Sequence, residues 1–266
     1  EREWDRTTNG FWFYLKGKPT FITGQHYFML AHWTIEGNSP KFRTTDMEWH
    51  YFWEYCWEDP KCYGMIEVTQ RRQGKSVRAG NTIYYRTSRV KEKKSGIQSK
   101  TDEDSKRLFS KQVVNPMKKL ERLFIPLMDK ALGTTPKKII SFNKTSSTSE
   151  QESDDEFEIK ELISEIDFRS STESAYDGDK LYVYISDECG KLENASIYKR
   201  HSTVKPSMTE EDRIIGKMLY TTTVEDIGDA DKYNEGNFER LWDESNQNKK
   251  DPKTKETVSG LYRYFL

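Results

Sequence analysis

Hydrophobic and polar positions along this chain alternate between two patterns. Short apolar or aromatic runs that end in turn residues predict strands, and longer stretches with apolar residues three or four positions apart predict helices. The predicted strands are residues 11–23 (two strands around a Gly-Lys-Pro turn), 63–68, 95–100, 137–143, 157–171, 179–188, 213–223 and 259–266. The predicted helices are residues 25–35, 46–58, 76–90, 102–114 and 117–132.

Strands that alternate with helices in this way predict an α/β fold, with a largely parallel central sheet flanked by helices. Residues 1–60 are expected to form an aromatic-rich hairpin and helices packed on a core made by residues 61–266. In residues 46–58, Asp46 is the expected helix cap. The stretch 144–156 has few apolar residues, which predicts a mobile surface loop inside the core region.

The composition is that of a folded protein with many charged residues. Hydrophobic residues make up 34% and charged residues 33%, a balance that leans towards disorder, but 13% aromatic residues supply the apolar area of a folded protein. Three cysteines, Cys56, Cys62 and Cys189, form neither a paired framework nor a zinc spacing, which favours reduced thiols in a cytosolic setting. Because no apolar run reaches membrane-spanning length, we expect a soluble protein without membrane contact.

Charge is spread unevenly along the chain. Residues 69–144 carry 20 Lys and Arg against 6 Asp and Glu, and residues 150–193 carry 4 against 15. The two blocks are either ordinary solvated faces, or a basic face that binds a phosphate backbone next to an acidic one. In the second case Lys91, Lys93 and Lys94 are candidate DNA contacts.

The stretch 69–76, "TQRRQGKS", follows a predicted buried strand and precedes a predicted helix. Backbone N–H groups at such a turn cradle phosphates, while a lysine adds charge and a hydroxyl binds Mg²⁺. Gly74, Lys75 and Ser76 fit these roles. Thr69 stands where phosphate loops usually have their first glycine, and two arginines lie inside the loop, so a basic surface turn is the alternative.

Two further strands end in chemically useful residues. Asp187 and Glu188 close an apolar strand, where one carboxylate can hold Mg²⁺ and the next can orient and deprotonate a water molecule. Thr221, Thr222 and Thr223 close the strand that follows and can report the loss of a γ-phosphate. An Asp-Glu pair also occurs in ordinary turns, and threonines are common in β structure.

These elements, in this order and spacing, resemble the ATPase domain of the large terminase subunit of tailed bacteriophages, the motor that drives DNA into the capsid. The resemblance rests on "RRQGKS", "YVYISDE" and "MLYTTT", with support from "SAYDGDK" at 174–180 and from the terminal "GLYRYFL". That family tolerates a phosphate loop without its first glycine and with an arginine inside. It implies a P-loop NTPase fold of the additional-strand, catalytic-glutamate type.

The resemblance also implies roles, with ATP and Mg²⁺ as the bound species. The residues are Gln73, Gly74, Lys75 and Ser76 at the phosphates, Ser76 and Asp187 at Mg²⁺, Glu188 as the catalytic carboxylate, Arg71 as an arginine finger acting in cis, Gln25 and Tyr27 at adenine, and Thr221, Thr222 and Thr223 in coupling. The implied partners are double-stranded DNA, a portal protein, a small terminase subunit and further copies in a ring, in the cytoplasm of an infected bacterial host.

The chain lacks an initial Met and stops in an apolar run, so we expect a fragment of a longer protein, without the nuclease domain that follows in this family and without nuclease activity. Three other functions stay open. They are a helicase-like ATPase, a GTP-binding switch whose guanine loop begins at Asn143 and Lys144, and a module that binds nucleic acid without hydrolysis. Glu188 disfavours the module that only binds nucleic acid, because binding without hydrolysis needs no carboxylate to orient water.

Overall fold

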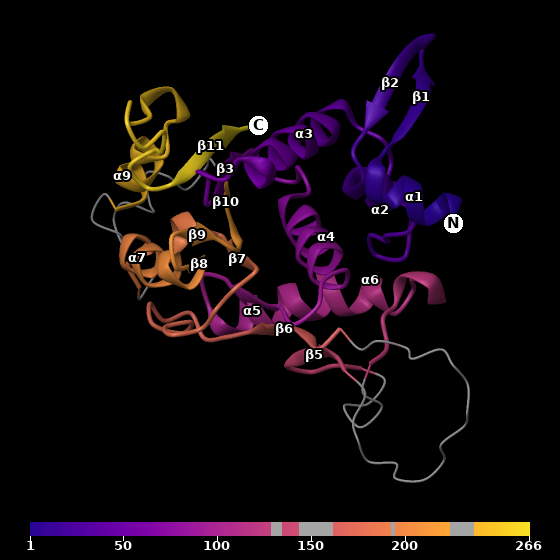
Figure 1. Cartoon of the computed structure of the whole chain (residues 1–266). Helices are drawn as coiled ribbons and strands as arrows, with labels where there is room; N and C mark the ends of the chain where they lie inside the picture. Colours follow the sequence, from indigo (N-terminus) through magenta and orange to yellow (C-terminus); the bar gives the residue numbers. More distant parts are fainter. Residues whose placement is uncertain (129–134, 144–161, 193–194, 224–236) are drawn as a thin grey trace.

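The structure, a computed structural model, describes residues 1–128, 135–143, 162–192, 195–223 and 237–266 (Figure 1). Within these ranges a seven-stranded sheet has the order β11-β3-β10-β7-β4-β6-β5, parallel except where β5 pairs antiparallel with β6. The strands are β3 (Gly64–Thr69), β4 (Lys94–Gln98), β5 (Ile139–Phe142), β6 (Ser164–Phe168), β7 (Val183–Asp187), β10 (Lys217–Thr223) and β11 (Leu261–Phe265). The predicted α/β architecture is therefore confirmed.

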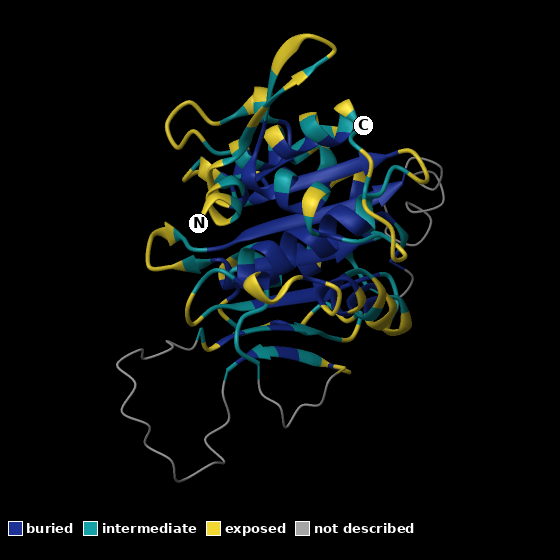
Figure 2. Ribbon diagram, turned by 90° about the vertical axis from the view of Figure 1, so that its right-hand side faces the viewer, coloured by how far each residue is buried: buried dark blue, intermediate teal, exposed yellow. Residues whose placement is uncertain are grey.

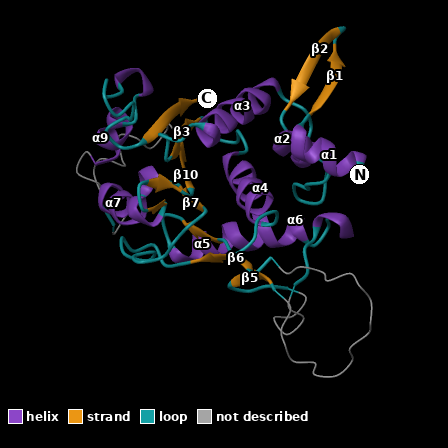
Figure 3. Ribbon diagram, viewed as in Figure 1, coloured by secondary structure: helices purple, strands orange, loops and turns teal. Residues whose placement is uncertain are grey.

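Helices cover both faces of this sheet (Figure 3). Side chains alternate along β7, so that Val183 and Ile185 pack on the face covered by α3 and α4, whereas Tyr184 packs on the face covered by α7 and α9. The helices are α3 (Thr44–Glu58), α4 (Lys75–Thr87), α7 (Ile197–Ser207) and α9 (Asn237–Glu244). The central strands are buried between these layers (Figure 2).

The N-terminal segment packs against the same core. It contains α1 (Arg2–Asn9), the hairpin of β1 (Phe11–Leu15) and β2 (Lys18–Ile22), and α2 (Gly24–Ala31). The hairpin projects from the body of the molecule (Figure 1). Phe28, Met29 and Trp33 lie in one hydrophobic cluster with Trp49 of α3 and Ile97 of β4. Burial of these large side chains ties the N-terminal segment to the sheet.

One long helical segment follows β4, and it contains a local irregularity. It comprises α5 (Asp102–Leu108), a π-helix from Phe109 to Val114, and α6 (Asn115–Met117). Thr101 caps it, with its side chain accepting from the N–H of Asp104. The remaining short elements are the 3₁₀ turns 122–124, 189–191 and 247–249 and the strand pair β8 (Thr209–Glu210) and β9 (Arg213–Ile214).

Two predicted helices end earlier in the structure than expected. The helix predicted over 117–132 is wrong over residues 118–128, because helix stops at Met117 and a 3₁₀ turn follows at 122–124, and residues 129–132 lie outside the described residues. Pro126 has no N–H to continue it, and the Tyr84 hydroxyl donates to the Phe124 carbonyl at 2.9 Å. The helix predicted over 25–35 ends at Ala31.

Asp46 is not the cap of α3. The helix starts at Thr44 with Arg43 as its N-cap residue, and Asp46 lies in the first turn, where it binds Arg43. The predicted loop at 144–156 lies outside the described residues. Among the residues that are described, no helix is long and apolar enough to cross a membrane.

Candidate functional site

Three predicted motifs meet at one edge of the sheet. β3 ends at Thr69 and leads through the loop 70–74 into α4, β7 ends at Asp187, and β10 ends at Thr223. These strands are parallel, so their carboxyl ends lie together. β10 lies between the other two and is the additional strand that the resemblance implies.

The loop enters α4 through Gly74. Its φ of 80° and ψ of 17° are left-handed, a conformation in which glycine has no steric cost. A Cβ on Gly74 would lie 3.0 Å from Nη2 of Arg43. The first N–H groups of α4 have no partner within a helix, which makes this end of the helix suited to an anion.

Lys75, the first residue of α4, faces the acidic end of β7. Its Nζ donates to Oε1 of Glu188 and lies 3.6 Å from Oδ1 of Asp187. Burial lowers the pKa of Lys75, but attraction to Asp187 and Glu188 outweighs this effect and raises the pKa above its ordinary value. The lysine is therefore charged, and in the nucleotide-free protein it pairs with the carboxylates of Asp187 and Glu188.

Two hydroxyl groups fix the carboxylate of Asp187. Ser76 Oγ donates to Oδ2 at 3.1 Å, and Thr221 Oγ1 donates to Oδ1 at 2.6 Å. Asp187 is buried, at 6% exposure. A serine hydroxyl and a carboxylate are the hard oxygen ligands that Mg²⁺ prefers, so the donor set fits this ion.

Glu188 has a strained backbone and two lysine partners. Its φ of 52° and ψ of 37° are uncommon for a residue other than glycine, and such strain concentrates at functional sites. Lys75 contacts Oε1, and Lys191 Nζ lies 3.0 Å from Oε2. Burial raises the pKa of Glu188, but the charges of Lys75 and Lys191 outweigh this and lower it. Glu188 is thus ionised at neutral pH, as a base must be.

Two cavities adjoin at this carboxylate. One, of about 340 Å³, is lined by residues 70–77 with Glu188, Lys191 and Thr223. The other, of about 320 Å³, is lined by Ser76, Asp187, Glu188 and Lys191 together with residues of the β4 end and α5. The phosphate-loop residues and the two carboxylates therefore line two cavities that have Ser76, Glu188 and Lys191 in common.

The loop arginines and the predicted adenine residues are placed differently. Arg71 and Arg72 are exposed and line the loop-side cavity, and Arg72 has a φ of 64°. Gln25 is fully buried and donates to Thr82 of α4 at 2.7 Å, and Tyr27 donates to a glutamate of α1 at 2.8 Å. Gln25 and Tyr27 are absent from the described linings of both cavities. The finger and adenine roles stay predictions.

The three predicted coupling threonines are buried in β10. Thr221 reaches Asp187, as described above, and Thr222 packs on the turn after Glu188, since a Cβ on Gly190 would meet Thr222 Oγ1 at 2.8 Å. A shift of β10 would therefore reach the Asp187 carboxylate and the turn that follows Glu188. Coupling itself stays a prediction.

The predicted DNA-binding lysines lie elsewhere. Lys94 is the first residue of β4, so it lies at the amino edge of the parallel sheet, opposite the phosphate loop. Its Nζ contacts Glu165 at 3.3 Å, Asp167 at 3.7 Å and Asp179 at 3.0 Å. Lys91 lies 3.4 Å from a neighbouring glutamate, and Lys93 lies above the Tyr182 ring. DNA contact through this group stays a prediction, and for Lys94 a phosphate must compete with three carboxylates.

Sequence reasoning did not identify several residues beside the loop. Lys191, three positions after Glu188, contacts the predicted catalytic carboxylate. Arg78 lies one helical turn after Gly74 and donates to the Gln73 carbonyl at 2.6 Å, and Arg43 donates to the same carbonyl at 3.0 Å. The spacing of Lys191 and Arg78 from the motifs was a usable signal, whereas nothing local to Arg43 points to the loop.

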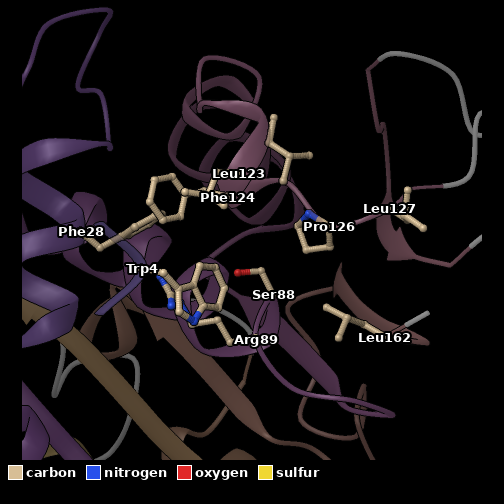
Figure 4. A pocket seen from close by; sticks show the side chains of 10 residues that line it. Trp4, Phe28, Ser88, Arg89, Leu123, Phe124, Pro126, Leu127 and Leu162 are labelled. Carbon is tan, nitrogen blue, oxygen red and sulfur yellow. The ribbon is translucent and has the colours of Figure 1, made fainter. Parts of the chain in front are cut away.

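A further cavity, of about 360 Å³, lies outside this site (Figure 4). Its walls are mainly apolar and include Trp4, Phe28 and Phe124, and the guanidinium of Arg89 lies 4.6 Å from the centre of the Trp4 ring. None of the predicted phosphate, magnesium or coupling residues is among its described lining residues. We assign it no part in the chemistry of the loop.

Comparison with known proteins gives a structural match without a sequence match. No family model matches the chain, and no curated protein matches it. The ATPase domain of the large terminase of Thermus phage P74-26 is similar in structure, with a TM-score of 0.52 and 13% identity over 90% of this chain and 84% of that one. An arginine-to-alanine mutant of that domain has a TM-score of 0.55 and 13% identity over 91% of this chain and 84% of that one. The chain thus has the fold of a terminase ATPase domain.

Proposed function

We propose that this chain hydrolyses ATP to ADP and phosphate, and that the reaction drives double-stranded DNA into a viral capsid. One observation carries the proposal. A phosphate loop with Lys75 and Ser76 faces Asp187 and Glu188 across the additional strand of a terminase-like fold. A fold alone does not define a function, so the argument rests on the chemistry of these four side chains.

Binding begins with an exchange of partners at Lys75. In the free protein its ammonium is bonded to Glu188. The β- and γ-phosphates of ATP carry more negative charge and are also met by the N–H groups at the start of α4. Lys75 therefore leaves Glu188 for phosphate, and the carboxylate becomes available to water.

Ser76 and Asp187 are the residues that would hold Mg²⁺. The Asp187 carboxylate is already oriented by Thr221 and Ser76, so little reorganisation is needed. When bound, the ion neutralises charge on the phosphate oxygens.

Glu188 then acts on water. Its carboxylate accepts a proton from the water whose oxygen bonds to the γ-phosphorus, while the bond from that phosphorus to the β–γ bridging oxygen breaks and the electron pair leaves with ADP. Lys191 stays beside Oε2 and keeps the carboxylate in place. Arg71 at the loop-side cavity is the proposed source of positive charge for the transition state.

Coupling to DNA is proposed to run through β10. Thr221 binds the Asp187 carboxylate, so loss of the γ-phosphate alters the environment of the strand that also packs on the Glu188 turn. At the level of the assembly, we propose a ring of copies that contacts a portal protein and a small terminase subunit in the cytoplasm of the bacterial host.

The test is phosphate release from Mg²⁺-ATP, with and without double-stranded DNA. Glu188→Gln is expected to lower the rate by about 10²- to 10⁴-fold. Glu165→Gln is the matched control, because Glu165 also pairs with a lysine but at the opposite edge of the sheet. Equal rates for the wild type and Glu188→Gln would contradict the proposal.

A further inference from the structure

Two guanidinium groups bind one backbone carbonyl of the phosphate loop. Arg43 Nη2 donates to the Gln73 oxygen at 3.0 Å, and Arg78 Nη1 donates to it at 2.6 Å. We infer that Arg43, acting together with Arg78, is a positioning residue that sets the direction of the Gly74 N–H in the phosphate cradle. The inference rests on the proposed function of the loop, and it brings the start of α3 into the site.

Peptide geometry links the direction of the Gln73 carbonyl to that of the Gly74 N–H. The peptide joining Gln73 to Gly74 is planar and trans, so its carbonyl and its N–H point in opposite directions. Holding the carbonyl on the side of Arg43 and Arg78 turns the Gly74 N–H away from them. A carbonyl turned the other way would present negative charge to a phosphate, so this peptide orientation decides whether the loop attracts or repels an anion.

The two arginines are themselves held by acidic partners. Asp46 accepts from Arg43 Nε at 2.7 Å and Nη2 at 2.8 Å, and from Arg78 Nη1 at 2.9 Å. Arg78 is fully buried and also pairs with Glu67 of β3, whose other oxygen accepts from Trp49 Nε1 at 2.9 Å. The buried charges of Arg78, Asp46 and Glu67 are thus paired with one another, the condition under which buried ions are tolerated, and the partly exposed Arg43 adds a second positive charge at Asp46.

This loop has a particular need for such support. Thr69, at the place of the usual first glycine, is buried and paired with Thr223 as the last residue of β3. The turn is therefore confined to residues 70–74, and Arg72 within it has a left-handed φ of 64°. A short, strained turn keeps its conformation only when its surroundings fix it, and α3 and α4 supply the fixing groups.

Arg43 is the residue to change, because its side chain is 40% exposed and its loss leaves the buried Arg78 pairs in place. In Arg43→Ala we expect faster amide hydrogen exchange over residues 70–76 in the nucleotide-free protein. We also expect ADP to bind about tenfold more weakly, because the loop loses one charge-assisted hydrogen bond whose contribution is reduced by solvent screening. The kcat at saturating ATP should change much less.

Two variants serve as controls. Arg6→Ala is matched, since Arg6 is 38% exposed and also pairs with an acidic residue three positions away, and it should change neither exchange at 70–76 nor ADP affinity. Arg43→Lys keeps the charge but loses the planar fork that reaches Asp46 and Gln73 together, so it should stay close to Arg43→Ala. Full recovery of ADP affinity in Arg43→Lys would assign the effect to charge alone and overturn the inference.

The exchange measurement separates this inference from the proposed function. Unchanged exchange over 70–76 in Arg43→Ala overturns the inference, whether or not the protein hydrolyses ATP. Faster exchange with unaltered ADP affinity also overturns it, because the peptide orientation would then not matter to phosphate. If the wild type binds no ADP, the proposed function fails, while faster exchange would still support the structural role of Arg43.

Discussion

Glu188→Gln is expected to separate nucleotide binding from hydrolysis. In the free protein Lys75 donates to Glu188, and their side chains are only 11% and 20% exposed. The Lys75 ammonium stays charged in the variant, so the substitution removes only the charge of the acceptor, about 1–1.5 kcal/mol of a hydrogen bond that contributes about 1.5–3 kcal/mol. The amide therefore competes less well for Lys75 by about 1–1.5 kcal/mol, which corresponds to ATP binding up to about tenfold tighter.

The assay pairs two measurements on the same variants. Titration with a fluorescent ATP analogue in Mg²⁺ gives affinity, and single-turnover phosphate release gives the chemical step. We expect Lys75→Ala to abolish productive ATP binding, because the lysine neutralises phosphate charge in the ground state, whereas Glu188 acts in the transition state. Equal loss of ATP affinity in Glu188→Gln and Lys75→Ala would refute this assignment.

Three further results are expected. In the full-length motor engaged with DNA, Arg71→Ala should slow hydrolysis by about 10³-fold with little change in ATP affinity, and Arg72→Ala should slow hydrolysis much less. A near-normal hydrolysis rate for Arg71→Ala would place the arginine finger elsewhere. Burial lowers the pKa of His26 and of His201 to about 4 each, below the ordinary 6.5, so the unfolded chain binds more protons than the folded one between these pH values. The urea concentration at the unfolding midpoint should therefore fall as the pH drops from 6.5 towards 5, and a midpoint that does not change would contradict the buried placement of the two histidines. Binding of double-stranded DNA should be independent of sequence, weaken steeply with salt and decrease when Lys91 and Lys93 are replaced by Ala, whereas a lack of binding at low salt by both the isolated domain and a forced oligomer would leave these lysines as a solvated surface.

Much of the fold follows from local pattern. The strands that became β3, β7 and β10 are short, apolar and bounded by polar turns, and burial on both faces of a parallel sheet requires that pattern. Apolar spacing predicted a helix over 117–132, but Glu121 and Ile125 have extended backbone on either side of the 3₁₀ turn, and Ile125 precedes Pro126, which disfavours the helical conformation there. The first residue of the predicted helix, Met117, is buried in the main cluster, so apolar character there reflects packing at the end of a helix.

The site was predictable as far as its motifs are local. Asp187 and Glu188 lie at the end of β7, and Gly74, Lys75 and Ser76 lie at the start of α4 after the loop that follows β3, where chain order and chemistry together indicate their use. The support of the loop was not predictable, because Arg43 lies at the start of a separate helix, α3, and reaches Gln73 only through tertiary packing. From the sequence, Asp46 has the features of an ordinary helix cap, and only the structure shows that it binds both Arg43 and Arg78.

The most direct test of the account is a crystal structure of the wild-type chain with Mg²⁺ and a non-hydrolysable ATP analogue. We expect the β- and γ-phosphates at the N–H groups of Gly74, Lys75 and Ser76, the Lys75 ammonium on phosphate instead of Glu188, and Mg²⁺ beside Ser76 and Asp187. A nucleotide bound elsewhere, with the Lys75–Glu188 pair intact at saturating analogue, would contradict the central claim that this edge of the sheet is an ATP site.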